Sequence, residues 1–402
     1  MSPTHPPRLL FFNAHVYGPV DDWRPGWLLT EGRRIHLMGP GQPPPLPEGS
    51  VFQQIDATGK ILLPGFIDLH VHGAMGHELM DASPEGLRAM AQFYARHGVT
   101  AFLPTTWTAS RRGIMQALHA VAQTMGPIPN GATILGAHLE GPYLNPARCG
   151  AQDSALIRRV EREEALEFLD TGIVRLLALA PEYAENLWLI EECVRRGITV
   201  SAAHTEAVFE EMLVAVERGL RQATHTFNAM TAFGHRQPGA VGAALALPQI
   251  CCELIADDIH VHPAAVKILL EVKGPERVIL ITDAIRGAGM PDGEYRLDRR
   301  TIIVHDGAAR LPDGTLAGSM LTMDRALQNI LQATGRSLRE AWPTTSLNAA
   351  RAIGLSASKG SLEVGKDADL VLLNTDLNVC LTVAQGAIVY RPTDTTGKAG
   401  GC

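Results

Sequence analysis

Residues 64–73 read PGFIDLHVHG, and they place two histidines at the end of an apolar run. Side chains two apart in a β-strand point to the same side, so His70 and His72 share one face. The apolar residues from 61 to 69 predict that this face is buried. Because a buried polar group costs free energy without a partner, the two imidazoles either satisfy each other and nearby backbone or bind a metal ion.

Strand and helix patterns alternate from this stretch as far as residue 355. Amphipathic stretches such as PEGLRAMAQFYARHG and EAVFEEMLVAVERG separate short apolar runs, and several end in the glycine typical of a helix C-cap. The predicted strands are ILLPGFIDLHV, GVTAFLPT, ATILGAHLE, VRLLALAPE, ITVSAAH, QATHTF, CCELIAD and RVILITDA. Repeated alternation of this length predicts a parallel barrel of the (β/α)8 type, which takes about 250 residues.

The two ends of the chain predict a second, smaller unit. Residues 1–60 and 356–394 both read as short apolar runs broken by Gly, Pro and Asp, as in strands joined by turns. Chain ends often lie close together, so we expect one small β-sandwich domain from both termini beside a barrel of residues 61–355. The predicted fold class is therefore α/β, a TIM-like barrel with this added domain. The Gly-rich residues 395–402 are expected to be a disordered tail.

Composition excludes several classes of protein. Of the 402 residues, 46% are hydrophobic and 19% are charged, as in an ordinary globular protein. The net charge of −7 gives no basic surface of the kind that binds nucleic acid or an anionic membrane. No apolar run reaches the roughly 18 residues of a membrane span, and the N-terminus lacks the apolar segment of a signal peptide. We therefore expect no nucleic-acid partner, no membrane partner and a cytoplasmic location.

Polar side chains end most of the predicted strands. In a parallel barrel these ends meet at one mouth, where the chemistry takes place. Each residue alone has a simpler interpretation, because a strand-end histidine is commonly a core residue and a strand-end Asp commonly caps a helix. Gathered at one mouth, their uncompensated charges would repel one another, and a divalent cation resolves that conflict. The strand-end residues are His70, His72, His138, Glu140, His204, His225, Asp257, His260 and Asp283.

This set of residues predicts a catalytic metal site. Imidazole and carboxylate ligands suit Zn, Fe, Mn or Co, and the lack of a C-x-x-C pair argues against a structural zinc cage. Asp283, in the run ITDA, lies far along the chain from the other groups. A carboxylate beside a metal-activated water can take its proton and pass it to a leaving group. We therefore assign Asp283 the role of catalytic acid/base.

Further motifs along the chain are GVTAFLPT, HLEGPYLN, SAAHTEA, HTFNAM, ADDIHVHP, ITDA and LAGSMLTMDRALQN, with the ending SLNAARAIGLSASKGSLEVGKDADLVLL. Together with PGFIDLHVHG, they make nearly the whole chain resemble the N-acetylglucosamine-6-phosphate deacetylases of the amidohydrolase superfamily. HLEGP and HxFNAM are specific for the deacetylase branch, whereas the H-x-H pair is shared across the superfamily. The resemblance implies metal-dependent hydrolysis of N-acetyl-D-glucosamine 6-phosphate to D-glucosamine 6-phosphate and acetate.

The same resemblance implies the metal ligands. Glu140, His204 and His225 correspond to the ligands of the ion that every member keeps. His70 and His72 correspond to the pair that holds a second ion in some members. Both histidines are present, so the resemblance implies one or two divalent ions per subunit.

Roles toward the substrate follow from the resemblance in the same way. Asn228 and Ala229 correspond to contacts with the sugar phosphate, and His260 corresponds to a phosphate contact. Arg236 corresponds to an arginine that reaches the phosphate from the neighbouring subunit of a homodimer. Arginine suits this role because its fork matches phosphate oxygens.

Two positions depart from the family pattern. Gln152 stands where the family has a histidine that polarises the acetyl carbonyl, and its amide can donate a hydrogen bond but cannot become cationic. Either Gln152 performs this role more weakly, or another group such as His138 compensates, or the substrate differs. Asp258 stands where a glycine is usual, and its carboxylate is unfavourable near a phosphate unless it points away.

Two other functions stay open at this point. Gln152 and Asp258 favour an amidohydrolase that acts on another acylated amino sugar, such as N-acetylgalactosamine 6-phosphate. A non-catalytic barrel that serves as a binding or scaffold protein is the remaining alternative, although such a protein would be expected to lose metal ligands and this chain keeps them all. Turnover of a panel of acylated amino sugars would distinguish the first alternative from the N-acetylglucosamine 6-phosphate activity. A measurement of bound metal would distinguish the second alternative from an enzyme.

Overall fold

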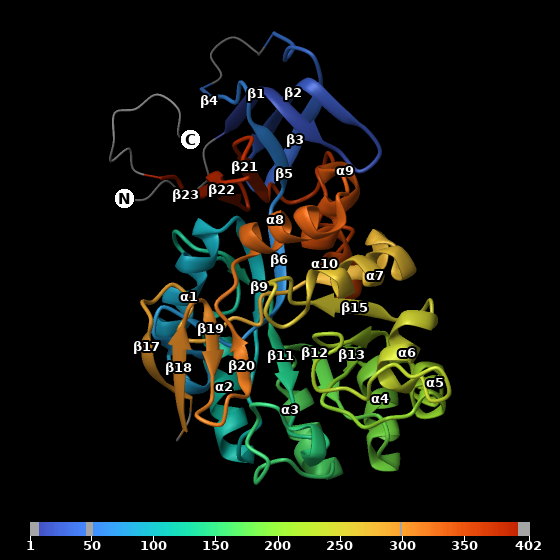
Figure 1. Cartoon of the computed structure of the whole chain (residues 1–402). Coiled ribbons are helices and arrows are strands. Elements are labelled where there is room, and N and C mark those ends of the chain that lie inside the picture. Colours follow the sequence, from blue (N-terminus) through green and yellow to red (C-terminus); the bar gives the residue numbers. More distant parts are fainter. Residues whose placement is uncertain (1–7, 46–50, 298–299, 393–402) are drawn as a thin grey trace.

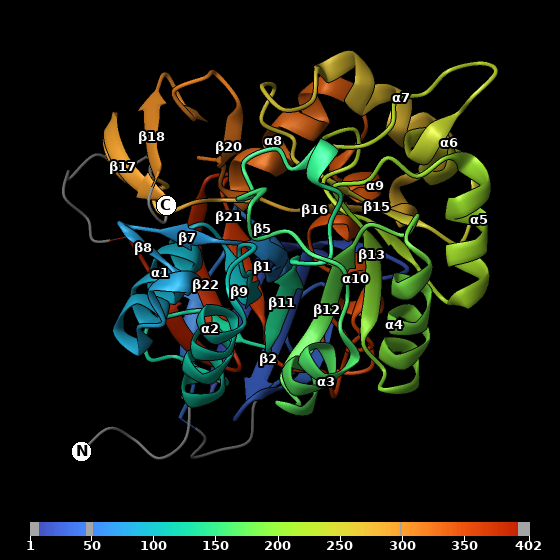
Figure 2. The same cartoon turned by 90° about the horizontal axis from the view of Figure 1, so that it is seen from below.

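Eight parallel strands form a ring at the centre of the structure (Figures 1 and 2). The computed structural model describes residues 8–45, 51–297 and 300–392. Parallel pairing joins β6 to β9 and runs from β11 to β16, and the bridges Thr105–His138 and Val71–Ala284 close the ring. The strands are β6 (Phe66–Val71), β9 (Val99–Pro104), β11 (Ala137–Glu140), β12 (Val174–Leu179), β13 (Thr199–Ala202), β14 (Gln222–Ala223), β15 (Cys251–Leu254) and β16 (Val278–Leu280). Each predicted strand contains one of them, and the predicted barrel is confirmed.

Helices follow the strands and cover the outside of the ring. Ser83 and Ser110 begin two of them by accepting backbone hydrogen bonds, and Gly219 ends a third with a left-handed φ of 114°. The helices are α1 (Pro84–Arg96), α2 (Arg111–Thr124), α3 (Arg162–Asp170), α4 (Ala184–Arg195), α5 (Phe209–Arg218), α6 (Gly239–Ala246), α7 (Pro263–Lys273), α8 (Met323–Thr334), α9 (Leu338–Ala341) and α10 (Leu347–Ala352). Short 3-10 helices span Leu79–Asp81, Pro146–Arg148, Pro275–Arg277 and Trp342–Thr345. No helix in the described ranges is long and apolar enough to cross a membrane.

Most residues of the barrel strands are buried. Every residue of β6 and of β9 is buried, which accounts for their nearly continuous apolar sequence. Helices cover the outer face, and side chains fill the inside of the ring. The polar residues at the carboxyl ends of these strands are therefore held on a rigid support.

Strands from the two ends of the chain form one continuous sheet above the barrel, shown in blue and red in Figure 1. Its order is β23-β22-β21-β5-β1-β2-β3, with β4 beside β1. The strands are β1 (Leu9–Tyr17), β2 (Asp22–Glu31), β3 (Arg34–Pro40), β4 (Gln53–Asp56), β5 (Ile61–Pro64), β21 (Leu370–Leu373), β22 (Val379–Ala384) and β23 (Ala387–Tyr390). Phe11, Leu28, Leu62 and Leu370 belong to a buried cluster of this sheet. The predicted pairing of the two chain ends is confirmed.

The division into residues 1–60 with 356–394, and 61–355, stays a prediction. The strand β5 begins at Ile61, after the predicted boundary, and it pairs with β1 and β21 in the sheet of the chain ends. The predicted tail 395–402 lies outside the described residues.

A second antiparallel sheet, inserted between β16 and α8, is not predicted from the sequence. It consists of β17 (Gly293–Leu297), β18 (Arg300–His305), β19 (Ala308–Arg310) and β20 (Leu316–Ser319). Its apolar side chains Leu297, Ile302 and Ala317 pack with Trp107 and Ile285 from the barrel loops. Around its last strand, Thr315, Leu316 and Gly318 line a cavity at the mouth of the barrel. Two smaller pieces, β7 (Gly73–Ala74) with β8 (His77–Glu78), and β10 (Thr133–Ile134) beside β9, complete the strands.

Candidate active site and metal centre

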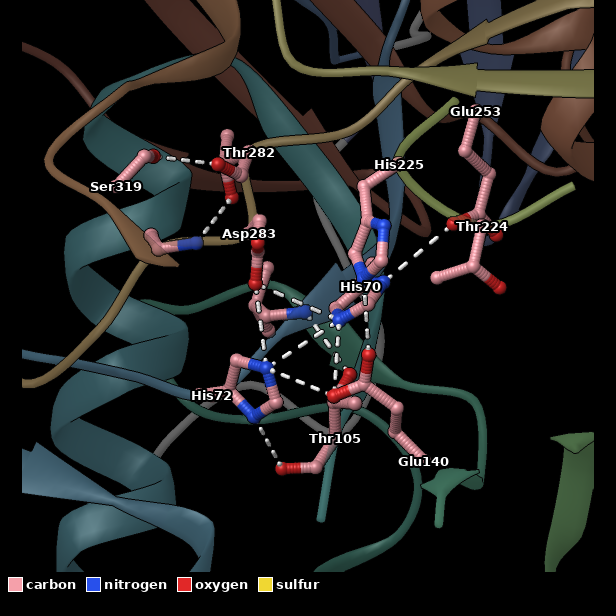
Figure 3. A network of polar contacts seen from close by, with 12 residues as sticks. His70, His72, Thr105, Glu140, Thr224, His225, Glu253, Thr282, Asp283 and Ser319 are labelled. Atoms are coloured by element: carbon pink, nitrogen blue, oxygen red, sulfur yellow. Dashed lines mark hydrogen bonds and ion pairs between the residues drawn. The ribbon is translucent and has the colours of Figure 1, made fainter. Parts of the chain in front are cut away.

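The five predicted metal ligands meet at the carboxyl ends of the barrel strands. Figure 3 shows four of them, which are His70, His72, Glu140 and His225. His70 lies in β6, with His72 just beyond it, and Glu140 is the last residue of β11. His204 and His225 each follow their strands, β13 and β14, by two residues. All five are at most 6% exposed. Four of them, without His70, line a cavity of about 320 Å³.

Two groups of three ligands share Glu140. Its Oε2 lies 3.4 Å from His72 Nε2 and 3.7 Å from His70 Nε2. Its Oε1 lies 3.3 Å from the Nε2 atoms of both His204 and His225. Each carboxylate oxygen therefore belongs to one group, so Glu140 could supply one ligand atom to each of them.

The Nδ1 atoms of three of these imidazoles, which point away from the centre of the site, face hydrogen-bond acceptors. Such contacts place the proton on Nδ1 and leave Nε2 with a lone pair that points to the centre of the site. The pairs are His70 with Glu253 Oε2 (3.4 Å), His72 with the Thr105 carbonyl (3.2 Å) and His204 with the Arg148 carbonyl (2.8 Å). Second contacts of this kind are typical of metal-binding histidines.

The Nε2 atoms, which point to the centre of the site, lie close together in two pairs. The Nε2 atoms of His70 and His72 lie 3.2 Å apart, and those of His204 and His225 lie 3.2 Å apart. Lone pairs at this distance repel one another unless a positive charge lies between them. The donor set, with imidazole nitrogens and one shared carboxylate, therefore fits divalent cations of the Zn, Fe, Mn or Co type.

The pKa values of the group reflect the same attraction for positive charge. Burial raises the pKa of Glu140, but His70 and the other imidazoles outweigh it and hold that pKa well below its usual value. Burial lowers the pKa of His70, but Asp283 and Glu140 outweigh it and raise that pKa well above its usual value. The carboxylates are therefore anionic at neutral pH, and they draw a proton or a metal ion to the imidazoles.

Asp283 faces the His70–His72 side of the site. Its Oδ1 lies 3.4 Å from His70 Nε2 and 3.2 Å from His72 Nε2. Burial raises its pKa, but the two imidazoles lower it to about 2. Its backbone N–H donates to the His70 carbonyl at 2.9 Å, and its carbonyl accepts from the Ser319 N–H at 2.8 Å. These bonds hold the carboxylate at the cavity, which it lines.

Three site residues have left-handed backbone conformations. The φ angles are 44° at His204, 31° at His225 and 50° at Asp283. Such conformations cost about 1–3 kcal/mol each for non-glycine residues and persist where the surrounding structure requires them. The turns after three strands are thus shaped to aim these side chains into the cavity.

Gln152 lines the cavity and contacts the shared carboxylate. Its Nε2 donates to Glu140 Oε2 at 2.7 Å, and its Oε1 accepts from the Thr108 N–H at 2.7 Å. The Thr108 N–H can only donate, so it fixes which end of the amide faces Glu140.

The predicted substrate contacts divide into two groups. Asn228, Ala229 and His260 line the same cavity as the metal ligands. His260 is oriented by Asp257, whose Oδ2 lies 2.6 Å from His260 Nδ1. Arg236 is exposed and is not among the residues that line the cavity within its own chain.

The positions of Asp258 and His138 answer two questions that the sequence leaves open, namely whether Asp258 faces the substrate and whether His138 can replace the missing histidine. Asp258 is exposed and has a φ of 64°, a conformation that Gly adopts freely and Asp tolerates. It does not line the cavity, so its carboxylate is not among the groups that face a ligand there. His138 lies behind His70, with ring centroids 4.6 Å apart, and also does not line the cavity. The alternative in which His138 compensates for Gln152 therefore lacks the necessary geometry.

Glu253 and Trp107 contribute to the site without having been predicted. Glu253 is fully buried in β15 and supports His70, and the Trp107 ring stacks on His72 at a centroid distance of 3.8 Å. A charged residue within the apolar run CCELIAD is the one signal that singles out Glu253 in the sequence. No comparable signal marks Trp107.

Residues 61–394 match the model of the Amidohydrolase family. The chain is 40% identical over 372 residues to the N-acetylglucosamine-6-phosphate deacetylase of Lysinibacillus sphaericus, covering 92% of this chain and 93% of the relative. It is 39% identical over 335 residues to the N-acetylgalactosamine-6-phosphate deacetylase of Escherichia coli O157:H7, covering 83% and 89%. Both relatives span most of the chain.

Solved structures give the same result. The N-acetylglucosamine-6-phosphate deacetylase of Pasteurella multocida superimposes with a TM-score of 0.89 at 32% identity, covering 95% of this chain and 99% of that one. A mutant of the Mycobacterium smegmatis deacetylase in complex with N-acetyl-D-glucosamine-6-phosphate superimposes with a TM-score of 0.88, also at 32% identity and with the same coverage.

Proposed function

The chain belongs to the amidohydrolase family, and we propose that it converts N-acetyl-D-glucosamine 6-phosphate to D-glucosamine 6-phosphate and acetate. It is a hydrolase that acts on an amide bond. The observation that carries the proposed substrate is the convergence of two imidazole pairs on Glu140, with Asp283 beside them, in one cavity with the predicted sugar-phosphate contacts. The complete ligand set and the family disfavour a non-catalytic scaffold.

The cofactor that we propose is a divalent metal, Zn, Fe, Mn or Co, with one or two ions per subunit. Glu140, His204 and His225 would hold one ion, and His70 and His72 with the other oxygen of Glu140 would hold the second. Bound metal supplies a Lewis acid that polarises a carbonyl and lowers the pKa of water.

Asp283 moves the proton in the proposed reaction. Its low pKa leaves it as a carboxylate at neutral pH, ready to accept a proton from the attacking water. The water oxygen bonds to the acetyl carbon, and Asp283 then returns the proton to the nitrogen as the carbon–nitrogen bond breaks. The amine and acetate leave with all atoms accounted for.

Gln152 polarises the acetyl oxygen in this proposal. One of its two N–H groups donates to Glu140, and we assign the other to the substrate's acetyl oxygen. Asn228 and Ala229 contact the sugar phosphate, and His260, oriented by Asp257, contacts the phosphate. The substrate is thus held at both ends of the cavity.

The partner that we propose is a second copy of the chain. Arg236 lies on a loop close in sequence to Asn228 and Ala229, and the same loop carries Phe233, which is 63% exposed. An exposed aromatic beside an exposed arginine is typical of protein interfaces. In the proposed homodimer, Arg236 reaches the phosphate in the neighbouring active site. The cytoplasmic location stays a prediction.

A second candidate substrate is N-acetylgalactosamine 6-phosphate. The Escherichia coli O157:H7 relative, named for that substrate, is nearly as similar to this chain as the Lysinibacillus sphaericus relative. The two compounds differ only in the orientation of one hydroxyl. Gln152 also leaves this alternative open, because it departs from the histidine of the family pattern.

A substrate panel on protein of measured metal content tests the proposal. The compounds are N-acetylglucosamine 6-phosphate, its galacto isomer and unphosphorylated N-acetylglucosamine. We expect a kcat/KM of at least ~10⁴ M⁻¹s⁻¹ for the gluco phosphate and much less for the other two. A higher value for the galacto isomer would transfer the proposal to the second candidate. No turnover of any compound by metal-loaded protein would overturn both.

A further inference from the structure

A second cavity, of about 360 Å³, lies at the end of the barrel opposite the active site. Thr199, Gln222 and Cys251, the first residues of β13, β14 and β15, line it, and so does Arg277, just before β16. The metal ligands lie at or beyond the carboxyl ends of the barrel strands. The two cavities share no lining residue.

The wall of this second cavity is positively charged. Arg221, Arg277 and Arg351 line it together with one carboxylate, Glu276, so three positive charges and one negative charge give +2. Arg221 donates to two backbone carbonyls, and Arg277 Nη1 lies 3.9 Å from Cys251 Sγ. Within the described residues, none of the three guanidinium groups forms an ion pair with a carboxylate. Their charge is therefore available to a ligand.

Two buried amides beside these arginines have unused hydrogen-bonding groups. Gln222 is 1% exposed, and neither its Nε2 nor its Oε1 has a hydrogen-bond partner among the residues that the structure describes. Asn348 is 2% exposed and donates to the carbonyls of Pro275 and Val278, while its Oδ1 has no hydrogen-bond partner in the described part of the chain. A buried polar group without a partner costs about 1–3 kcal/mol, so such groups mark positions where a polar ligand is favoured.

We propose that this cavity binds a small phosphate monoester. A phosphate dianion matches the charge of +2, and its oxygens suit guanidinium groups and the Gln222 amide N–H. Hydroxyl groups on the rest of the ligand would donate to Gln222 Oε1 and Asn348 Oδ1. The cavity is about as large as the active-site cavity of about 320 Å³, so it accepts a ligand larger than a bare phosphate ion.

The thiol of Cys251 lines the cavity, so its rate of alkylation can report whether a ligand is bound there. This cysteine is free and partly exposed, whereas Cys193 and Cys252 are buried. Cys149 is also free and partly exposed, and its neighbour Gly150 lines the active site. Alkylation by iodoacetamide, followed at each cysteine by peptide mass spectrometry, therefore reads the two cavities separately.

The test compares alkylation of Cys251 in glucose 6-phosphate, in inorganic phosphate and in sodium chloride of equal ionic strength. At a ligand concentration about ten times Kd, glucose 6-phosphate is expected to slow alkylation about tenfold. Sodium chloride is expected to have no effect. Equal protection by inorganic phosphate would assign the cavity to the free ion and overturn the monoester. A lack of protection by glucose 6-phosphate up to millimolar concentrations would overturn the site.

Two arginine variants complete the test. Arg351→Ala removes one guanidinium group at the rim and is expected to abolish protection of Cys251, with deacetylation unchanged. Arg112→Ala, at an exposed position on α2 outside the cavity, serves as the matched control and is expected to keep protection. Protection that persists in Arg351→Ala would show that the effect arises elsewhere and would overturn the proposal.

Discussion

Gln152 donates its side-chain amide to Glu140 Oε2 across 2.7 Å, and so contacts the carboxylate that both groups of metal ligands share. The Thr108 N–H holds the other end of the amide at 2.7 Å. This position thus keeps a fixed hydrogen-bond donor in the cavity although it has no histidine. The Thr108 N–H fixes the orientation of the amide, and an amide does not gain or lose a proton near neutral pH. The Gln152 N–H donor is therefore present at any pH at which the protein is folded.

Removal of this donor is expected to slow the reaction. In Gln152→Ala we expect kcat/KM to fall by about 10²–10³, because one stabilising hydrogen bond to the acetyl oxygen is lost. Gln152→His, which restores the residue of the family pattern, is expected to stay within about tenfold of the parent protein. Steady-state rates are measured on samples of equal metal content. Unchanged kcat/KM in the alanine variant would show that Gln152 has no role in polarising the substrate.

Asp283→Asn is expected to remove the proton carrier while leaving the fold and the metal in place. We expect kcat to fall by about 10²–10⁴, the usual contribution of a general acid/base. Asp324→Asn is a suitable control, because Asp324 contacts His97 outside the cavity and is expected to keep normal turnover. Parent-level kcat in Asp283→Asn with full metal content would rule out the proposed role.

Glu253 is expected to tune the metal held by His70 and His72. Glu253→Gln keeps the shape of the side chain but removes the charge that faces His70 Nδ1 at 3.4 Å. A supporting group of this kind contributes about 10–100-fold to metal affinity. In protein loaded with two ions per subunit, chelator titration with metal analysis should show that one of the two ions leaves earlier in this variant. Equal weakening of both ions, or of neither, would contradict the assignment.

The barrel could be predicted because its signals are local. Strands buried on both faces, such as β6 and β9, show as continuous apolar runs, and the ends of such runs are where ligands gather. The sheet β17–β20 has no such signal, because its strands are short and partly exposed. It is held by non-local packing on Trp107 and Ile285. The helix α6, with sequence GAVGAALA, lacks a polar face, so no amphipathic pattern marks it in the sequence.

The candidate site also combines features that the local sequence predicts with features that it does not. The metal ligands follow from residue type and strand position, which the sequence displays. The contact between His70 and Glu253 joins residues 183 positions apart, and nothing local indicates it. The 2.7 Å bond between Gln152 and Glu140 also depends on how the loop after β11 folds back over the barrel. Supporting contacts of this kind are set by tertiary structure rather than by local pattern.

Lys359 is expected to contribute strongly to stability. It is 5% exposed and donates to Asp369 Oδ2 at 2.7 Å, with Asp367 Oδ2 at 2.8 Å. Lys359→Met leaves Asp369 without its cation and leaves Asp367 paired with Arg34 alone, which is expected to cost about 3–5 kcal/mol of unfolding free energy. Arg88→Ala, which breaks an exposed pair with Glu85, is expected to cost less than about 1 kcal/mol. Urea unfolding at neutral pH measures both, and similar losses in the two variants would contradict the prediction.

The stabilisation that Lys359 provides is expected to decrease at alkaline pH. Burial lowers the pKa of Lys359, but Asp369 and Asp367 outweigh it and raise that pKa above 10.5. A group whose pKa is higher in the folded state stabilises the protein fully below its unfolded pKa, and the contribution is lost as pH rises through the folded pKa. The difference in unfolding free energy between the parent protein and Lys359→Met should therefore shrink above about pH 10.5. A difference that stays constant through this range would show that the charge is not responsible.

Arg236 is expected to serve the active site of the neighbouring subunit. Arg236→Ala alone should raise KM for the phosphorylated sugar, because a guanidinium contact with the phosphate is lost. Mixing Arg236→Ala with Asp283→Asn, after dissociation and reassociation, distinguishes the two subunits. In a hybrid dimer, one site has both Asp283 and the partner subunit's Arg236, and the other site has neither. If half of the dimers are hybrids with one intact site of two, activity should recover to about a quarter of the parent value. An arginine that acts within its own chain would give no recovery, because no subunit in the mixture carries both residues.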